Sequence, residues 1–111
     1  MISQTAENKY LITLTEINLD NAMQLLSQGE NILNDFKNNK NSNNFHENCQ
    51  IFFDFNNIQN VNSAVIAICL QWLKLAKKNQ ILVEFLHFSD NINSLISLYG
   101  LNDIINIKHN I

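Results

Sequence analysis

The sequence contains no arginine and only two glycines among its 111 residues, and these shortages exclude several kinds of site. A dinucleotide-binding fingerprint or a phosphate-cradling loop needs more glycines than the chain has. Without arginine, the chain lacks the planar side chain that holds a phosphate through two parallel hydrogen bonds. The formal net charge is −3 and the lysines are scattered, so the clustered basic face that nucleic acid requires is also missing. We therefore expect neither a phosphate-binding loop nor a nucleic-acid partner.

Cysteine and long apolar runs are scarce as well. Cys49 and Cys69 could form one disulfide, but residues 1–9 are polar and do not resemble an export signal. Both cysteines are therefore interpreted as reduced thiols of a cytosolic protein. The longest nearly continuous apolar run, residues 64–70, is far shorter than the roughly 20 residues that span a bilayer. Any membrane association is expected to go through a partner rather than by direct insertion.

Catalytic and metal-binding patterns are weak. His46 and Cys49 have the H-x-x-C spacing of half a metal site, but no second pair completes four ligands. A loop histidine beside a strand cysteine is the simpler interpretation. His87 and His109 lie on strand-like segments without a carboxylate pattern nearby. The acidic residues are interpreted as helix caps or solvated side chains (Asp54, Glu84, Asp90 and Asp103). The sequence thus predicts no catalytic residues, no metal site and no cofactor.

What the chain does have is enough apolar residues for one globular domain. Hydrophobic residues make up 46% of the sequence, which favours a single domain over residues 1–111 with its core at about 10–107. Their periodicity alternates between that of strands and that of helices. The predicted order is a strand from Tyr10, a helix from an N-cap at Asp20 to the asparagine-rich loop 38–44, a strand at 49–55, a helix at 63–79, a strand at 81–88, a helix at 92–99 capped by Asp90 and ended by Gly100, and a short strand at 104–107.

This alternation predicts an α/β fold, with a mixed β-sheet whose parallel strands are joined by right-handed crossovers and with helices packed on it. The runs at 49–55 (CQIFFDF) and 81–88 (ILVEFLHF) are mostly apolar, as in strands buried on both faces. Gly29 lies inside the first helix, where it weakens the helix by about 1 kcal/mol relative to alanine and could mark a kink.

The most informative stretch is residues 51–75. An apolar strand ends in Asp54, a loop follows, and Asn62 and Ser63 stand directly before an apolar helix. This pattern resembles the signature of STAS domains, in which a strand ends in aspartate and a loop leads to Asp-Ser or Asp-Thr at a helix start. The resemblance places Asp54 at the strand-end acid, Asn62 at the loop acid and Ser63 at the hydroxyl residue. In antagonist members of the family that hydroxyl is phosphorylated.

Two later stretches, residues 75–79 (LAKKN) and 97–104 (SLYGLNDI), resemble the STAS branch that supplies the cytosolic subunit of the Mla phospholipid-transporting ABC systems of bacteria. The resemblance implies a non-catalytic accessory subunit that binds and regulates the ATPase of an ABC transporter serving outer-membrane lipid asymmetry. Such a subunit would be cytoplasmic and peripheral to the inner membrane through its partner. The alternative is a phospho-regulated protein-binding switch of the anti-sigma-factor-antagonist type, with Ser63 as the phosphorylated residue.

Departures from the family pattern bear on this choice. Asn62 replaces the loop acid and so removes a negative charge beside Ser63, while Ala64 and Val65 stand where the family usually has glycine. Both changes favour a packing contact over recognition by a kinase. Asn62 or Ser63 is also expected to cap the following helix, a role that does not exclude partner binding.

The helix after Ser63 has more apolar surface than one sheet face can cover. Its apolar residues form two stripes, one of Ile66, Leu70 and Leu73 and one of Val65, Ile68, Cys69, Trp72 and Ala76. Either neighbouring helices cover the second stripe, or part of it is exposed and forms a contact patch anchored by Trp72. Under the second hypothesis the partner-binding set is Asn62, Ser63, Val65, Ile68 and Trp72. An exposed apolar patch would also favour self-association of the isolated protein.

Overall fold

The computed structural model describes residues 1–39 and 50–105, which form four strands and three helices. In chain order these are β1 (Ile2–Ala6), β2 (Lys9–Ile12), α1 (Ala22–Asn39), β3 (Gln50–Asp54), α2 (Ser63–Lys78), β4 (Leu82–Leu86) and α3 (Asp90–Leu98). The strand order in the sheet is β1-β2-β3-β4, with β1 antiparallel to β2 and the other neighbours parallel. The predicted α/β fold with a mixed sheet is confirmed.

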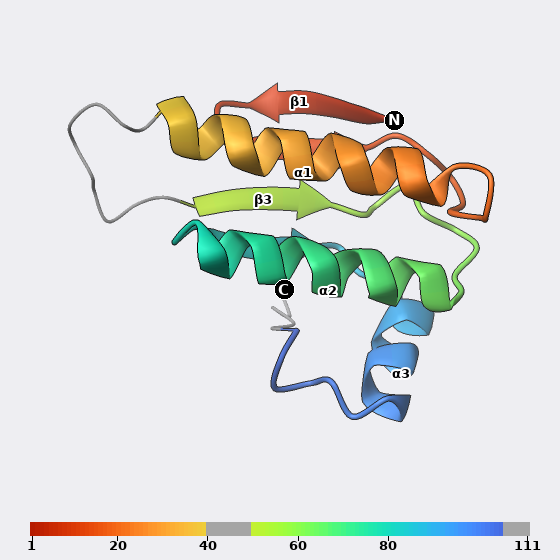
Figure 1. Ribbon diagram of the computed structural model, residues 1–111. Helices are drawn as coiled ribbons and strands as arrows, with labels where there is room; N and C mark the ends of the chain where they lie inside the picture. Colours follow the sequence, from red (N-terminus) through yellow and green to blue (C-terminus); the bar gives the residue numbers. More distant parts are fainter. Residues whose placement is uncertain (40–49, 106–111) are drawn as a thin grey trace.

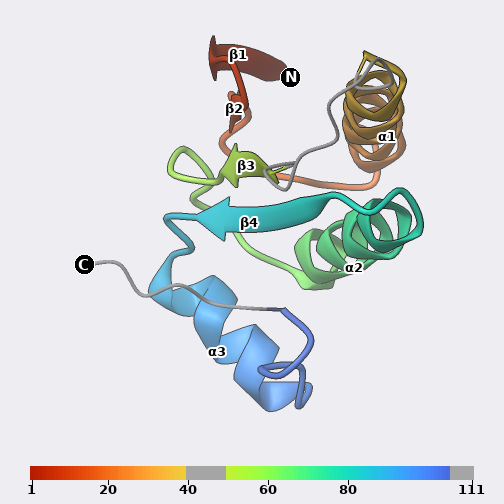
Figure 2. The ribbon, with the colours of Figure 1, turned by 90° about the vertical axis from the view of Figure 1, so that its left-hand side faces the viewer.

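Two helices share one face of the sheet. Figure 2 shows α1 and α2 side by side on that face, with α3 beyond the β4 edge. α1 connects β2 to β3 and α2 connects β3 to β4, and both helices run opposite to β3 (Figure 1). Each of these helices therefore starts at the end of the sheet where the parallel strands finish. The loops that join strand to helix gather there.

Side chains alternate between the two faces of the sheet. Phe53 is buried toward the helices, and its ring stacks on that of Trp72 in α2 with a centroid distance of 4.4 Å. Phe52 is half-buried on the other face, where Lys9 Nζ lies 5.8 Å from the centre of its ring. No helix within residues 1–39 and 50–105 lies on that face (Figure 2). The expectation of strands buried on both faces is wrong for this part of the chain, because right-handed crossovers that advance in one direction place their helices on one side.

The contact between α1 and α2, here called the helix seam, is centred on Gly29 and Trp72. A Cβ atom on Gly29 would overlap the indole ring of Trp72. The indole Nε1 also donates a hydrogen bond of 3.1 Å to the carbonyl oxygen of Leu26, one turn earlier in α1. α1 is continuous across Gly29, so the glycine serves close helix approach and not a kink.

The side chains that hold the starts of α1 and α3 are not the ones that were predicted. Before α1, Asn18 Oδ1 accepts from the Asn21 amide and Asn21 Oδ1 accepts from the Asn18 amide, at 3.1 and 2.8 Å. This reciprocal pair has the pattern of a capping box and holds the turn that leads into α1, so Asn18 and Asn21 take the place of the predicted Asp20. Before α3, the Ser89 hydroxyl accepts from the Ile92 amide at 3.2 Å, so Asp90 is the first helical residue. Neighbouring cap-forming residues made the choice ambiguous in the sequence.

The end of α3 is as predicted. Gly100 has a φ of 70°, and the amide of Leu101 donates to the carbonyl of Ile96 at 2.9 Å. The Gly100 amide donates to the Ser97 carbonyl at 3.0 Å, which completes a Schellman motif. Glycine reaches this left-handed conformation without the steric cost that a Cβ atom adds.

The two ends of the described chain differ from expectation. β1 was not predicted, because its outward residues are polar, and it forms by antiparallel pairing of Ile2 with Ile12 at the sheet edge. Ile104 and Ile105 lie in a turn and a bend, so the predicted final strand is wrong as far as residue 105. The rest of that strand lies outside the described residues, as do most of the asparagine-rich loop and His46, Cys49 and His109.

Candidate partner-binding surface

Asn62 fixes the start of α2 with both ends of its side-chain amide. Its Oδ1 accepts a hydrogen bond of 2.9 Å from the Ala64 amide and thereby caps α2. Its Nδ2 donates a hydrogen bond of 2.8 Å to the carbonyl of Ile17, in the loop before α1. An aspartate could make the first bond but has no hydrogen for the second. The departure from the acid of the STAS pattern therefore has a structural reason.

Glu16 joins the same two loops from the other side. Its carboxylate accepts hydrogen bonds of 3.0 Å from the side-chain amides of Asn60 and Asn18. These two bonds, that from Asn60 first, lower the pKa of Glu16 from its ordinary value of 4.5. We call residues 13–21 and 55–62 the carboxyl-end rim, because they follow the carboxyl ends of β2 and β3. The hydrogen-bonded polar side chains of the rim form a network that ends beside Ser63.

Ser63 is exposed at the first position of α2. Asn62 provides the cap, and no described residue forms a hydrogen bond with the Ser63 hydroxyl. The hydroxyl therefore points out at the positive end of the helix dipole, where an acceptor or a phosphate group is stabilised. Of the predicted set, the structure brings Asn62 and Ser63 together at one exposed helix start.

Val65, Ile68 and Trp72 do not belong to this exposed surface. All three are buried in the core, which corrects the expectation of a partly exposed patch. The cause is α1, which lies against α2 and receives Trp72 at Gly29, a contact that the periodicity of α2 alone does not reveal. Of the two interpretations of the second stripe, burial under a neighbouring helix is the correct one. Cys69 on the same helix is a buried free thiol, and burial raises its pKa.

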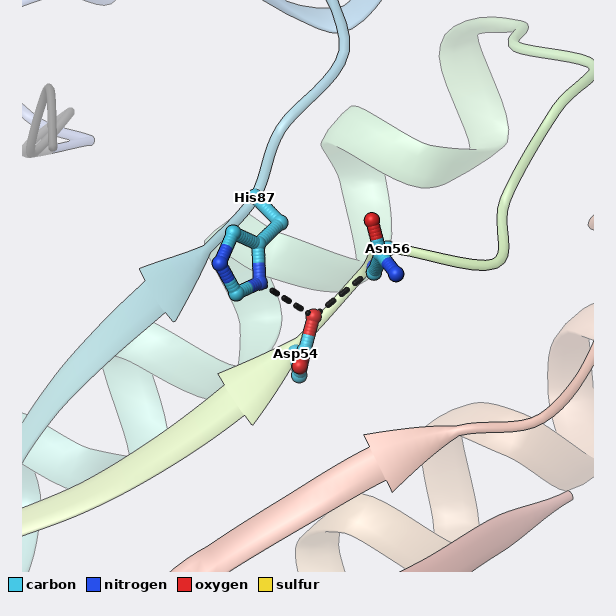
Figure 3. Close-up of polar contacts among 3 residues, drawn as sticks. All are labelled: Asp54, Asn56 and His87. Carbon is cyan, nitrogen blue, oxygen red and sulfur yellow. Dashed lines mark hydrogen bonds and ion pairs between the residues drawn. The ribbon is translucent and has the colours of Figure 1, made fainter. Parts of the chain in front are cut away.

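An aspartate–histidine pair closes the ends of β3 and β4 (Figure 3). Asp54 Oδ1 lies 2.9 Å from His87 Nδ1 and accepts a bond of 2.9 Å from the Asn56 amide. His87 has a φ of 61°, which a residue with a Cβ atom adopts only at a cost. Sequence analysis missed the pair, although parallel register sets Asp54 opposite Leu86, one residue before His87.

The hydrogen bond between Asp54 and His87 has a structural role, because it joins the ends of β3 and β4. In the described part of the chain, no serine, threonine or cysteine forms a hydrogen bond with His87. No three histidine, cysteine, aspartate or glutamate side chains gather there into a metal-binding group. Asp54, placed by the family pattern at the strand-end acid, thus orients the residues that follow β3 and β4.

Two large apolar side chains, one in the rim and one in the first turn of α1, are exposed and were not predicted as site residues. Leu19 is 93% exposed and Met23 is 70% exposed. Helical periodicity groups Met23 with the buried residues of α1, and Leu19 follows a strand-like pattern, so the sequence assigned both to other roles. Their exposure places apolar surface at the start of α1, the end at which α2 also starts (Figure 1).

The order of elements, the mixed sheet and the helix start at Asn62 and Ser63 define a STAS-like α/β fold. No protein-family model and no curated protein matches the chain. A chain of the Acinetobacter MlaFEDB complex in an ATP-bound conformation is similar, with a TM-score of 0.70 and 15% identity over 96% of this chain and 99% of that one. A Thermotoga maritima protein described as an anti-sigma factor antagonist has a TM-score of 0.68 and 16% identity, over 100% of this chain and 86% of that one.

These likenesses establish the fold. Within the described residues, no helix combines the length and the apolar composition that a membrane crossing needs.

Proposed function

We propose that this protein is a non-catalytic accessory subunit that binds and regulates the ATPase of an ABC transporter for phospholipids. The observation that carries the proposal is the likeness, over nearly the whole of both chains, to a chain of the MlaFEDB complex. The sequence stretches that resemble the Mla branch of the STAS family support it. In this role the protein is cytoplasmic and peripheral to the inner membrane through its partner.

The contact is made by the exposed start of α2 and the carboxyl-end rim. Asn62 and Glu16 hold both loops by side-chain hydrogen bonds, so this surface is ordered before a partner arrives. A preorganised surface loses less conformational entropy on binding. By binding one conformation of the ATPase more tightly than another, the subunit shifts the population of the two without any catalytic group of its own.

Affinity purification of the tagged protein from detergent-solubilised native membranes tests the proposal. We expect an ABC ATPase and its permease to co-purify, identified by mass spectrometry. Ser63→Arg, which puts a long cationic side chain at the exposed start of α2, should reduce recovery of the ATPase about tenfold. Ser3→Arg, on the exposed strand β1 at the far edge of the sheet, is the matched control and should leave recovery unchanged. Absence of any ABC ATPase from the wild-type sample would overturn the proposal.

A phospho-regulated switch is the second candidate function. It is favoured by the likeness to the Thermotoga maritima protein and by the exposed Ser63 hydroxyl at a helix start. This function predicts a kinase-like anti-sigma factor in the purified sample and a phosphopeptide that contains Ser63. Asn62 counts against it, because the amide needed for the hydrogen bond to Ile17 takes the place of an acid beside Ser63.

A further inference from the structure

Leu19 and Met23 are large apolar side chains that are exposed at the start of α1. The side chains of Asn18 and Asn21 hold residues 18–21 in a turn, and the Ala22 amide donates to the Asn18 carbonyl at 2.9 Å where α1 begins. Leu19 therefore lies in the turn that leads into α1, and Met23 lies in the first turn of the helix. Single exposed apolar residues are ordinary, and here two large ones lie four residues apart at one helix start. We call the pair the Leu19–Met23 surface.

This surface flanks α2. The side of α1 that meets α2 is marked by the Leu26 carbonyl, which accepts from Trp72, and by Asn34, whose Oδ1 accepts from Asn79 at 3.3 Å. Met23 lies three residues before Leu26, at a spacing that places neighbours on adjacent parts of one helix side. The hydrogen bond from Asn62 to Ile17 brings the start of α2 to the loop that leads into Leu19. The Leu19–Met23 surface and Ser63 therefore lie at the same end of the molecule.

The charges around this surface have one sign. Glu16 and Asp20 are exposed beside it, and the chain has no lysine or arginine between Lys9 and Lys37 or between Lys40 and Lys74. Hydrogen bonds from Asn60 and Asn18 lower the pKa of Glu16, so its carboxylate is ionised at neutral pH. The lysines Lys74, Lys77 and Lys78 lie toward the C-terminal end of α2, away from this surface. An apolar patch with an acidic border is complementary to an apolar segment that carries basic residues.

We propose that the Leu19–Met23 surface docks a basic, amphipathic segment of a protein partner, with Leu19 and Met23 as the apolar contacts and Glu16 and Asp20 as the acidic border. The inference rests on the proposed function, because it names the chemistry of the partner segment that reaches the Ser63 end. A second copy of this chain fits less well, since it would bring a second acidic border against the first.

A pair of designed peptides provides the probe. One is a helical peptide of about 14 residues made of leucine and lysine, and the other has glutamate in place of every lysine. Binding to the full chain is measured by isothermal titration, and the contact is located from amide shifts in 15N-labelled protein. We expect the basic peptide to bind, with shifts concentrated at residues 16–23 and 60–64, and the acidic peptide not to bind. Affinity should also fall as salt is raised, because exposed charges are screened.

Variants at exposed positions separate the apolar and the charged parts. The double variant Leu19→Ser/Met23→Ser should weaken binding of the basic peptide about tenfold, while Leu98→Ser, at a leucine that is 75% exposed on α3, should not. Asp20→Lys should weaken binding, and Asp103→Lys, at an exposed aspartate after α3, is its control. Equal binding of the double variant, binding of both peptides alike, or a concentration-dependent dimer that Leu19→Ser abolishes would each overturn the inference.

The inference and the proposed function fail in different ways. If an ABC ATPase co-purifies equally with wild type and with Leu19→Ser/Met23→Ser, the proposed function stands and the docking inference is wrong. If no ATPase co-purifies while the basic peptide still depends on Leu19 and Met23, the docking surface stands and the transporter role is wrong.

Discussion

Two regions hold α1 to α2, and they use opposite kinds of interaction. The helix seam is apolar and closely packed, with Trp72 seated on Gly29 in the core. At the carboxyl-end rim the interaction is polar, with the exposed side chains of Asn62, Glu16 and Asn60 joining the loops by hydrogen bonds. Packing of large buried side chains contributes several kcal/mol, whereas an exposed hydrogen bond contributes about 1 kcal/mol or less. The difference teaches that the seam maintains the fold while the rim orders a surface that stays available to a partner.

The largest effect should come from removing the centre of the seam. Trp72→Ala leaves a cavity between α1, α2 and β3 and removes the hydrogen bond to Leu26, so we expect a loss of about 3–5 kcal/mol in the free energy of unfolding. Urea denaturation measures it. Trp72→Phe keeps part of the ring volume and should cost less. A loss below about 1 kcal/mol for Trp72→Ala would show that the seam is not the main contact.

Gly29→Ala tests the same contact from the other helix. Alanine normally stabilises a helix by about 1 kcal/mol relative to glycine, but here its Cβ atom would overlap the Trp72 ring. We expect net destabilisation of roughly 1–3 kcal/mol. Ser27→Ala, at an exposed position of α1, is the control and should not destabilise. In the double variant with Trp72→Leu, the cost of Gly29→Ala should shrink, because the overlapping ring is gone. If the free-energy costs of Gly29→Ala and Trp72→Leu simply add in the double variant, the proposed contact between Gly29 and Trp72 is wrong.

At the rim, Asn62→Asp sharpens the comparison by changing a single group. The variant keeps the oxygen that caps α2 but loses the donor to the Ile17 carbonyl, and we expect a loss of about 1 kcal/mol. Asn91→Asp adds the same charge to the first turn of α3, where it should be neutral or slightly stabilising. Thermal unfolding of both variants provides the measurement. If Asn62→Asp is as stable as Asn91→Asp, the hydrogen bond to Ile17 does not contribute.

The smallest effect concerns Glu16. Its pKa in the folded protein lies below its ordinary value of 4.5, so its contribution to stability is present above pH 4.5 and is lost as the pH falls through the folded pKa. Glu16→Gln should therefore reduce the loss of stability below that pH while leaving the pH dependence above it unchanged. Glu7→Gln, at an exposed glutamate in the β1–β2 turn, controls for the change in net charge. Parallel acid-unfolding curves for wild type and Glu16→Gln would contradict the role of the Asn60 and Asn18 hydrogen bonds.

The sequence was sufficient to predict those elements whose boundaries are marked by local features of the sequence. The apolar run of β3, the polar residues before α2 and the glycine after α3 each predicted a boundary that the structure confirms within one or two residues. It was insufficient where a partner element decides the outcome. β1 forms because it pairs with β2. Its residues are mostly polar and exposed, so they show no alternation of apolar and polar residues that would predict a strand.

The candidate site divides in the same way. Asn62 and Ser63 were found from their position before an apolar helix, because capping is a local interaction. Val65, Ile68 and Trp72 were misassigned, since burial depends on neighbouring elements, which for Trp72 include a glycine in another helix. Leu19 and Met23 were missed because an apolar residue at helical spacing is usually a core residue, and only the position of α1 shows that these two face outward.

The separation of lysines from the rim also affects how fast a partner can bind. Lys74, Lys77 and Lys78 lie near one end of α2 and Lys9 begins the parallel strand β2 at that same end, while Glu16 and Asp20 lie at the other. Side-chain charges separated in this way turn a molecule in the field of a charged partner before the two surfaces touch. Encounters would then occur mostly with the rim leading, so the association rate would depend on ionic strength even where the final affinity comes from apolar contact.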